Sequence, residues 1–112
     1  MKTDELTGAA LDWAVLTLEE NENCAWYIDS KGRLMEEQGE WYSFAFQPST
    51  NWAHGGPIIE REMIDLKCLP TKQGGFIWRT ACADGPTPLI AAMRCYVASK
   101  LGDDIEIPEE LK

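Results

Sequence analysis

The stretch GPTPLIAAMRCYVASKLG, residues 85–102, contains the clearest fold signal in the chain. Thr87 is a favourable N-cap, and Pro88 follows at the first helical position, where its missing N–H leaves no hydrogen bond unmade. Gly102 stands where a helix end needs positive φ. Apolar residues repeat at helical spacing between these signals, namely Leu89, Ile90, Met93, Val97 and Leu101. The stretch therefore predicts a helix over 88–101 with one apolar side.

Arg94 interrupts the apolar pattern of this helix. A guanidinium among small apolar residues must be paired or must reach an opening, because an isolated charge is costly to bury. One interpretation is an internal ion pair with Glu60, Glu62 or Asp65, and this is the interpretation we favour. The other interpretation is a contact between Arg94 and a ligand.

A β-hairpin is predicted immediately before this helix. The apolar runs EMIDLKCL (62–69) and GFIWRTACA (75–83) flank residues 70–75, whose proline and glycines are typical of a hairpin loop. Trp78 and Arg79 are neighbours on the second run. This is the firmest strand pairing that the sequence indicates.

The start of the chain predicts another helix, over residues 4–19. Thr3 can cap it, Asp4 and Glu5 suit the positive end of its dipole, and apolar residues recur on one side. Gly8 is a weak point inside this helix, because glycine is a poor helix former.

The remaining segments carry strand signals. Strands are expected near 25–29 and 41–46, with a turn at 29–32, and a short edge strand is expected at 105–107. Helices at both ends of a chain, around antiparallel strands, are buried by layering on the sheet. The prediction is an α+β fold, a layered helix/antiparallel-sheet/helix sandwich in which residues 1–112 form a single domain.

Composition and charge limit the function classes. A chain of 112 residues, 45% of them hydrophobic, can bury a core without staples. Nineteen acidic and ten basic residues give a net charge of −9, which repels phosphate backbones, so broad nucleic-acid binding is not expected. Such a charge serves solubility or attracts a basic protein partner. DNA mimicry is a minor alternative, because the acidic clusters are short and interrupted.

The chain shows no targeting or membrane signal. Its first residues are charged, and no apolar run approaches the ~20 residues of a membrane span. We therefore expect a cytoplasmic protein with no membrane contact. The four cysteines, Cys24, Cys68, Cys82 and Cys95, form no Cys-x-x-Cys pair and are predicted to be reduced and mostly buried.

The segment PSTNWAHGGPIIERE, residues 48–62, allows two structures. In the first, Ser49 or Thr50 caps a single helix that runs to about Met63 and bends at Pro57. Its glycines let one helix face approach its neighbours closely. That face would carry Trp52, Gly55, Gly56, Ile59 and Met63.

In the second structure, residues 51–54 form a single turn, and Gly56 caps a new helix that begins at Pro57. Both structures leave backbone N–H groups at a helix start pointing outward, which is a seat for an anion. The segment does not decide between the two structures.

Three stretches resemble the NinX-like family of small tailed-phage proteins, long catalogued as a domain of unknown function: LTGAALDWAV (6–15), PSTNWAHGGPIIERE (48–62) and GPTPLIAAMRCYVASKLGDDIEIP (85–108). The resemblance implies a phage accessory gene product in the cytoplasm of the infected bacterial host. Its layout is similar to the phage α/β/α sandwich domains. The family pattern usually has Asp and Gln where this chain has Asn51 and His54, so no role for a carboxylate or an imidazole transfers there, and no catalytic residue transfers at all.

No catalytic or metal site is predicted. His54 is the only histidine and no cysteine lies close to it in sequence, whereas zinc sites need three or four ligands. Glu60 and Glu62 fall on different helix faces, and no phosphate-binding loop is present. We therefore expect no enzyme activity, no cofactor and no metal ion.

What remains is a set of arginines, tryptophans and helix starts from which a pocket for a small anionic aromatic molecule can be made. Trp52 has a competing interpretation as a core residue, which we favour for that residue. The predicted ligand-binding residues are Asn51, Trp52, Gly55, Gly56, Arg61, Trp78, Arg79, Thr87 and Arg94.

The leading hypothesis is a non-enzymatic phage protein that counters host defence by sequestering a nucleotide-type signal. The first alternative is an acidic module that inhibits or recruits a host protein, and the second is a hydrolase of the same nucleotides. A homo-oligomer is expected if the aromatic residues of 26–46, among them Trp26, Trp41 and Phe44, do not all fit inside.

Overall fold

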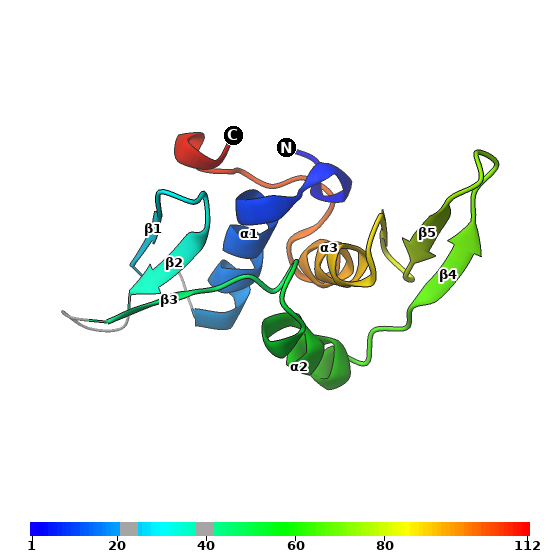
Figure 1. Ribbon diagram of the computed structural model, residues 1–112, viewed down its shortest axis with the longest axis horizontal. Helices are drawn as coiled ribbons and strands as arrows, with labels where there is room; N and C mark the ends of the chain where they lie inside the picture. The colour runs from blue at the N-terminus through cyan, green and yellow to red at the C-terminus, as the bar shows by residue number, and fades with distance from the viewer. Residues whose placement is uncertain (21–24, 38–41) are drawn as a thin grey trace.

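Three helices occupy the centre of the molecule in the computed structural model, which describes residues 1–20, 25–37 and 42–112 (Figure 1). They are α1 (Gly8–Glu20), α2 (Trp52–Glu62) and α3 (Pro88–Leu101). The helix α3 contacts both α1 and α2, so it is the common partner of the other two. Short 3-10 helices, η1 (Thr3–Glu5) and η2 (Glu109–Leu111), lie near the two chain ends.

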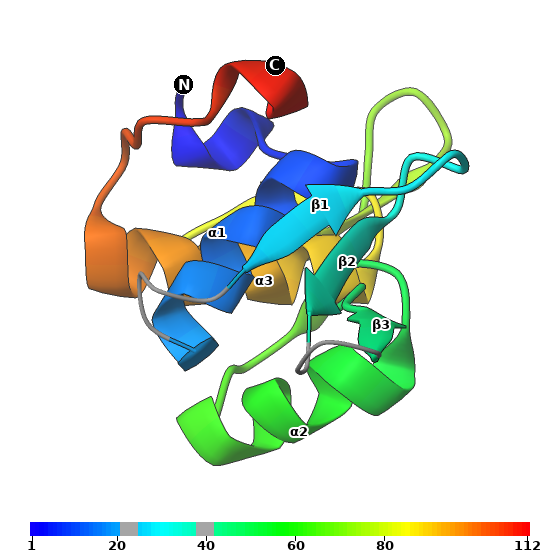
Figure 2. The ribbon, with the colours of Figure 1, turned by 90° about the vertical axis from the view of Figure 1, so that its left-hand side faces the viewer.

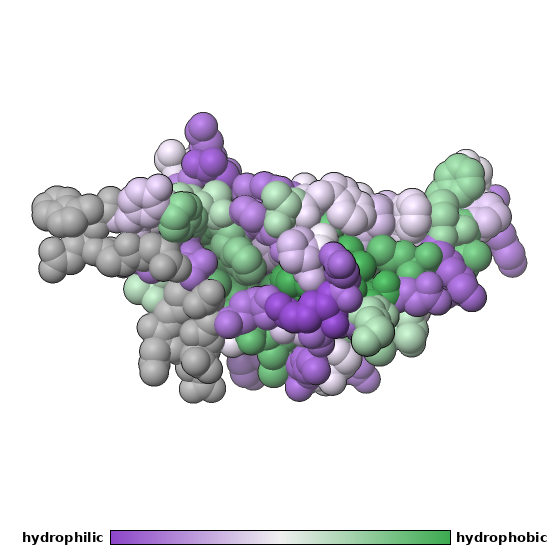
Figure 3. Space-filling view, turned by 90° about the horizontal axis from the view of Figure 1, so that it is seen from below, coloured by the Kyte–Doolittle hydropathy of each residue, from purple (hydrophilic) through white to green (hydrophobic). Residues whose placement is uncertain are grey.

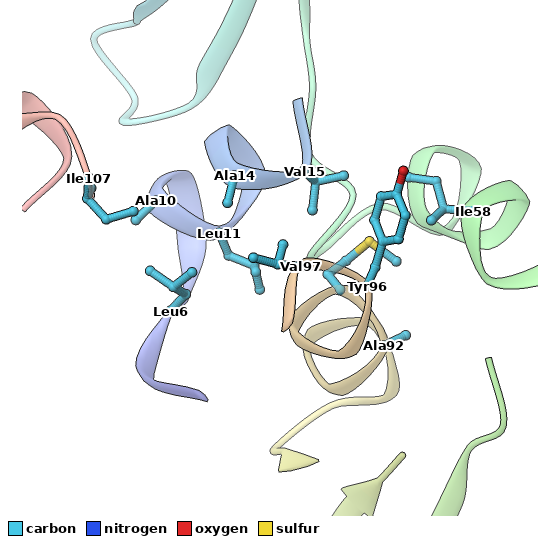
Figure 4. Packing of buried hydrophobic residues seen from close by; sticks show 11 residues of the cluster. Leu6, Ala10, Leu11, Ala14, Val15, Ile58, Ala92, Tyr96, Val97 and Ile107 are labelled. Carbon is cyan, nitrogen blue, oxygen red and sulfur yellow. The ribbon is translucent and has the colours of Figure 1, made fainter. Parts of the chain in front are cut away.

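The core forms where apolar sides of the three helices meet (Figure 4). Leu6 and Leu11 come from the N-terminal segment and α1, Val97 and Tyr96 from α3, and Ile58 from α2. Leu6, Leu11 and Val97 are fully buried. Burial of such side chains contributes on the order of 2 kcal/mol each, which makes this cluster the main source of stability.

The strands form two separate antiparallel sheets at opposite ends of the long axis (Figure 1). The first sheet has the order β1 (Trp26–Ile28), β2 (Leu34–Glu37), β3 (Ser43–Ala45). The second has the order β4 (Lys67–Pro70), β5 (Phe76–Arg79), β6 (Asp84–Gly85). In Figure 2 the first sheet crosses α1, which it contacts through β2, whereas the second sheet contacts α3 mainly through β6.

The predicted α+β class and single domain are confirmed, with the strands divided between two sheets rather than collected in one. The hairpin over 62–83 is confirmed as β4 and β5, and Thr87 and Gly102 flank α3 as predicted. The turn at 29–32 is also confirmed, but its second strand is β2, which the sequence did not indicate because Glu36 is buried where an apolar residue is expected. The strand predicted at 41–46 is β3, and residue 41 lies outside the described residues.

The N-terminal prediction needs a correction. The chain forms η1 first and begins α1 only at Gly8, whose φ of 55° turns the chain between the two elements. Thr3 does not cap α1, because its hydroxyl donates to the carbonyl oxygen of Gly102 at 2.7 Å.

The edge strand predicted at 105–107 is also wrong. That segment has no regular structure, and Ile107 is buried against the core instead.

The helix α2 decides between the two predicted structures of residues 48–62. It is one helix with Pro57 inside it, so the second structure is wrong. Its N-cap is Asn51, whose side-chain oxygen accepts from the amide of Ala53 at 2.9 Å, rather than Ser49 or Thr50. Gly55 and Ile58 are the buried positions, whereas Trp52 and Met63 are 55% and 87% exposed.

The interpretation of Trp52 as a core residue is therefore wrong. The helix α2 rests on its neighbours through Gly55, where the main chain at Pro48 and the side chain of Leu89 leave no room for a methyl group. The prediction that only one side of α3 is buried is also wrong. Ala91 to Val97 are all buried, because α1, α2 and β6 surround the helix, while Leu101 is 43% exposed.

Candidate functional site

A cleft with a volume of about 700 Å³ lies between the second sheet, η1 and α3. Phe76, Ile77 and Arg79 of β5 line it on one side. Arg94 of α3 and Asp4 of η1 line it as well, together with the turn that joins β5 to β6. The cleft exists because β6 is held against α3 while the hairpin of β4 and β5 stands away from the helices (Figure 1).

The guanidinium of Arg94 is a buried charged group that lines this cleft. Its Nε donates to the carbonyl oxygen of Leu6 at 2.8 Å, and its Nη1 donates to the carbonyl oxygen of Asp84 at 2.9 Å. Burial lowers the pKa of Arg94 from its ordinary value, and the charge of Asp4 opposes that shift. An arginine remains charged under such a shift, so one positive charge lines the cleft.

The ion pair predicted for Arg94 with Glu60, Glu62 or Asp65 is wrong. Across residues 1–20, 25–37 and 42–112, no carboxylate forms an ion pair with it. Arg94 reaches η1 and β6 and satisfies two donors with backbone carbonyls, which carry only partial negative charge.

Arg79 is already paired within the second sheet. It stands opposite Asp84 in the β5–β6 pairing, and its Nε and Nη2 donate to the two carboxylate oxygens at 3.0 and 3.1 Å. These hydrogen bonds raise the pKa of Arg79 above its ordinary value. An anion that enters the cleft therefore meets Arg79 only in competition with Asp84.

The two helix starts differ from the predicted anion seats. The amide of Ala53 is capped by Asn51, and the amide of Ile90 donates to the Thr87 hydroxyl at 3.1 Å. Trp52 and Thr87 line a separate hollow of about 240 Å³. These two backbone N–H groups were predicted to bind an anion. They already donate hydrogen bonds to the side chains of Asn51 and Thr87, so they are not free to do so.

Arg61 lies outside the cleft and joins the three helices. Its Nη1 and Nη2 both donate to the Glu19 carboxylate at 2.9 Å, and its Nε donates to Glu62 at 3.0 Å. The Tyr96 hydroxyl donates to the same Glu19 at 2.9 Å. The hydrogen bonds of Arg61 with Glu19 and Glu62 raise its pKa above its ordinary value. Because Glu19 belongs to α1 and Tyr96 to α3, the Arg61 side chain links α2 to both helices.

The structure thus brings together only two of the nine predicted binding residues in the cleft, Arg79 and Arg94. Gly55 packs against Pro48 and Leu89, whereas Gly56 stands beside Trp52 on the open side of α2. Trp78 is half-buried opposite Cys68 in the hairpin and does not line the cleft.

Sequence reasoning missed Asp4, Phe76, Ile77 and Cys82 as cleft residues. Asp4 lines the cleft because the fold brings the N-terminal segment next to residues that are far away in the sequence, among them Arg94. No local sequence pattern predicts such a long-range contact. Gly85 is a residue that could have indicated the cleft from the sequence. A Cβ there would lie 2.6 Å from the amide nitrogen of Ala91, so glycine allows β6 to press against α3 and close the cleft floor.

The lone histidine has a structural role. The Nδ1 atom of His54 accepts a hydrogen bond from the amide of Gln47 at 3.0 Å, and its ring stacks on Phe46. No group of three or more metal-ligating side chains occurs among the residues that the structure describes.

The cysteines differ from their predicted burial. Cys68 and Cys82 are exposed, Cys95 is buried, and Cys24 lies outside the described residues. Cys68 and Cys82 therefore do not serve mainly as packing residues. Cys68 lies on an outer hairpin and Cys82 on a turn between two strands, and both positions are at the surface, which explains the difference.

Comparison with protein families identifies the group to which the chain belongs. A family model described as "Bacteriophage P22, NinX" matches residues 2–100. The chain belongs to the NinX family. This NinX-family chain is a small phage accessory protein, as the three sequence stretches predicted. No curated protein matches it. Within the described part of this NinX-family chain, every helix is too short or too polar to cross a membrane.

Proposed function

We propose that this NinX-family protein binds a small anionic, nucleotide-type ligand in the cleft beside the second sheet and sequesters it without turning it over. The observation that carries the proposal is the Arg94 guanidinium, which lines the cleft and is bonded to two backbone carbonyls rather than to a carboxylate. A buried cation with only partial neutralisation favours an anion beside it.

The remaining lining residues suit the other parts of such a ligand. The volume of about 700 Å³ lies within the range of small-molecule sites, which is roughly 300–1,000 Å³. Phe76 is 68% exposed and offers a ring on which a base can stack. Asp4 and Asp84 limit the negative charge that the cleft tolerates, which favours a ligand with few phosphate charges over a polyphosphate.

Sequestration of a host signal is the proposed biological outcome, and it would counter host defence during infection. Membership of the NinX phage family supports this part of the proposal. No cofactor and no catalytic residue enters the proposal.

The test is a binding titration with a defined panel of host nucleotides and cyclic dinucleotides, read by calorimetry and by thermal shift. We expect at least one of them to bind, and Arg94→Lys to weaken it about tenfold, because lysine keeps the charge but loses the forked donors. Phe76→Ser should weaken it about threefold through lost stacking.

Arg33→Gln is the matched control for Arg79→Gln. Both arginines pair with an aspartate in a β turn or sheet, Arg33 with Asp29 at 2.7 Å and Arg79 with Asp84 at 3.0 Å, but only Arg79 lines the cleft. The change at 79 should alter affinity, while the change at 33 should not. Flat titrations across the panel, with no co-purifying small molecule, would contradict the proposal, and turnover of a bound nucleotide would favour a hydrolase.

A second candidate function, binding of a basic host protein, is supported by a different observation. Tyr42 and Phe44 are exposed on or beside the first sheet and contact each other edge to face, and Tyr27 on β1 is also exposed. Aromatic residues are enriched at interfaces, and a net charge of −9 attracts basic partners. Association that weakens with added salt and with Phe44→Ser, while Phe76→Ser has no effect, would support this function over ligand binding.

A further inference from the structure

The strand β1 is an edge strand of the first sheet, because it pairs with β2 on one side only. Two backbone hydrogen bonds fix the phase of this pairing. The amide of Glu37 donates to the carbonyl oxygen of Ala25 at 2.9 Å, just before the strand. The amide of Asp29 donates to the carbonyl oxygen of Arg33 at 3.1 Å, just after it. Hydrogen-bonded and non-hydrogen-bonded pairs alternate in an antiparallel ladder, so these bonds determine which backbone groups of β1 point away from β2.

Trp26 and Ile28 direct their backbone N–H and C=O groups to the outer side of the sheet, whereas those of Tyr27 face β2. Among residues 1–20, 25–37 and 42–112, no backbone group pairs with this outer side. The strand also lacks the charged and proline residues that block exposed edges, while β4 has both in Lys67 and Pro70. The edge of β1 is therefore open to pairing with another extended chain.

A hollow of about 380 Å³ lies beside this edge and is lined by Trp26, Tyr27, Ile28 and Glu110. Glu110 comes from η2, which lies above β1 in Figure 1. Its carboxylate is exposed, and within the described part of the chain no cation pairs with it. The hollow thus combines aromatic residues with an unpaired carboxylate, and both kinds of group attract a guanidinium or an ammonium.

Charge and backbone geometry indicate the kind of partner that this edge fits. The net charge of −9 and the Glu110 carboxylate both attract a positively charged partner and repel a nucleic-acid backbone. The outward backbone groups of Trp26 and Ile28 match the main chain of an extended peptide, as in other cases where a peptide adds a strand to a sheet edge.

We propose that the free edge of β1 binds an extended, basic segment of a partner protein, which adds a strand to the first sheet and places an arginine or lysine in the hollow against Glu110. This inference rests on the second candidate function, binding of a basic host protein, and assigns it a surface. Main-chain hydrogen bonds to Trp26 and Ile28 supply affinity, and the hollow selects the basic side chain.

The experiment uses the full chain and a displayed library of random octapeptides, selected for binding at low salt. We expect the recovered peptides to alternate arginine or lysine with β-branched residues. A synthetic copy of one recovered peptide is then titrated by fluorescence anisotropy. Glu110→Gln should weaken its binding about fivefold, because one ion pair near the surface is lost. Glu106→Gln removes an exposed glutamate outside the hollow, so this matched control should change binding by less than about twofold.

Methylation of the peptide amides tests the strand pairing itself. Every second amide of a bound strand faces β1, so methylation of one alternate set should abolish binding, while methylation of the other set should preserve it. Hydrogen exchange gives the matching result on the protein. The amides of Trp26 and Ile28 should exchange more slowly when the peptide is bound, while the amide of Tyr27 should not change.

The possible failures can be told apart. Recovered peptides without basic residues would overturn the proposal. Equal losses for Glu110→Gln and Glu106→Gln, or equal effects of the two methylated sets, would also overturn the assigned surface, although the second candidate function would stand. A selection that recovers no binder would remove that function as well.

Discussion

The helical centre and the hairpin end of the molecule are stabilised in different ways. In the centre, Leu6, Leu11 and Val97 are fully buried, and the apolar sides of α1 and α3 face each other. At the hairpin end, β4 and β5 have no fully buried side chain, and Phe76 is 68% exposed. Hydrophobic residues also gather toward the hairpin end in the space-filling view (Figure 3).

The protein can therefore change at the hairpin end with less loss of stability than in the centre. The centre depends on close packing, so substitutions there act on stability. The hairpin end depends on backbone pairing and on the Arg79–Asp84 pair, so substitutions there should act less on stability and more on the proposed binding of a ligand in the cleft. Variants in the centre and at the hairpin end should therefore differ in what they change.

The largest effect is expected from Leu11→Ala in the centre. The change leaves a cavity between α1 and α3 and should lower the free energy of unfolding by about 2–5 kcal/mol in urea titrations. Phe76→Ala, at the hairpin end, should change it by less than about 0.5 kcal/mol, because the ring is already exposed. Similar losses for both variants would refute the contrast.

The next effect concerns Asp12, a buried carboxylate that accepts a hydrogen bond from the amide of Ser49 at 2.9 Å. Burial raises its pKa from 3.8 to about 6. The folded state therefore holds the proton more tightly than the unfolded chain, so this group stabilises fully below about pH 4, and that stabilisation is lost as the pH rises to about 6.

Asp12→Asn removes this dependence. Relative to the variant, the parent protein should lose on the order of 3 kcal/mol between pH 4 and pH 7 in urea titrations. Asp29→Asn is the control of opposite sign, because hydrogen bonds from Arg33 lower the pKa of Asp29 and its stabilisation is lost as the pH falls. A parent-to-variant difference at position 12 that does not move with pH would contradict the burial argument.

Adjacent glycines in α2 supply a smaller, matched comparison. A Cβ at Gly55 would overlap the carbonyl oxygen of Pro48 and lie 2.6 Å from Leu89, whereas one at Gly56 would meet only Trp52 at 3.9 Å. Gly55→Ala should therefore cost roughly 1–3 kcal/mol through overpacking. Gly56→Ala should stabilise by up to about 1 kcal/mol, because alanine favours the helix. Thermal denaturation of the two variants in parallel measures both signs.

The smallest effect is expected from the first sheet. We propose that its exposed aromatic residues, Tyr42 and Phe44 among them, support weak self-association, as the sequence led us to expect. Light scattering should show a mass that rises with concentration, and Phe44→Ser should reduce it while Phe76→Ser does not. A constant monomer mass at millimolar protein would end this proposal.

Local signals in the sequence predicted the elements whose ends are marked by caps and turns. Thr87, Pro88 and Gly102 marked α3, and the loop at 70–75 marked the hairpin. The strand β2 was not predicted because its two glutamates mask the alternation of apolar and polar residues. Asn51 was not predicted as the N-cap because the hydroxyl residues before it, Ser49 and Thr50, were expected to fill that position.

The candidate site was less predictable, because its parts meet only through tertiary contacts. Arg94 was recognised as unusual, but its partners are backbone carbonyls of Leu6 and Asp84, and backbone carbonyls have no signature in a sequence. Arg61 and Arg79 could be identified as charged, yet which acid each one meets depends on how α2 and β6 are placed.

The bond between Arg94 and the carbonyl oxygen of Leu6 spans 88 positions of the chain, and the main apolar contacts of α1 are made with the same late helix. During synthesis from the N-terminus, α1 therefore emerges well before its partner. Until α3 leaves the ribosome, Leu6 and Leu11 have no permanent cover, so the chain is expected to complete its fold only late in translation and to depend on chaperone shielding before then.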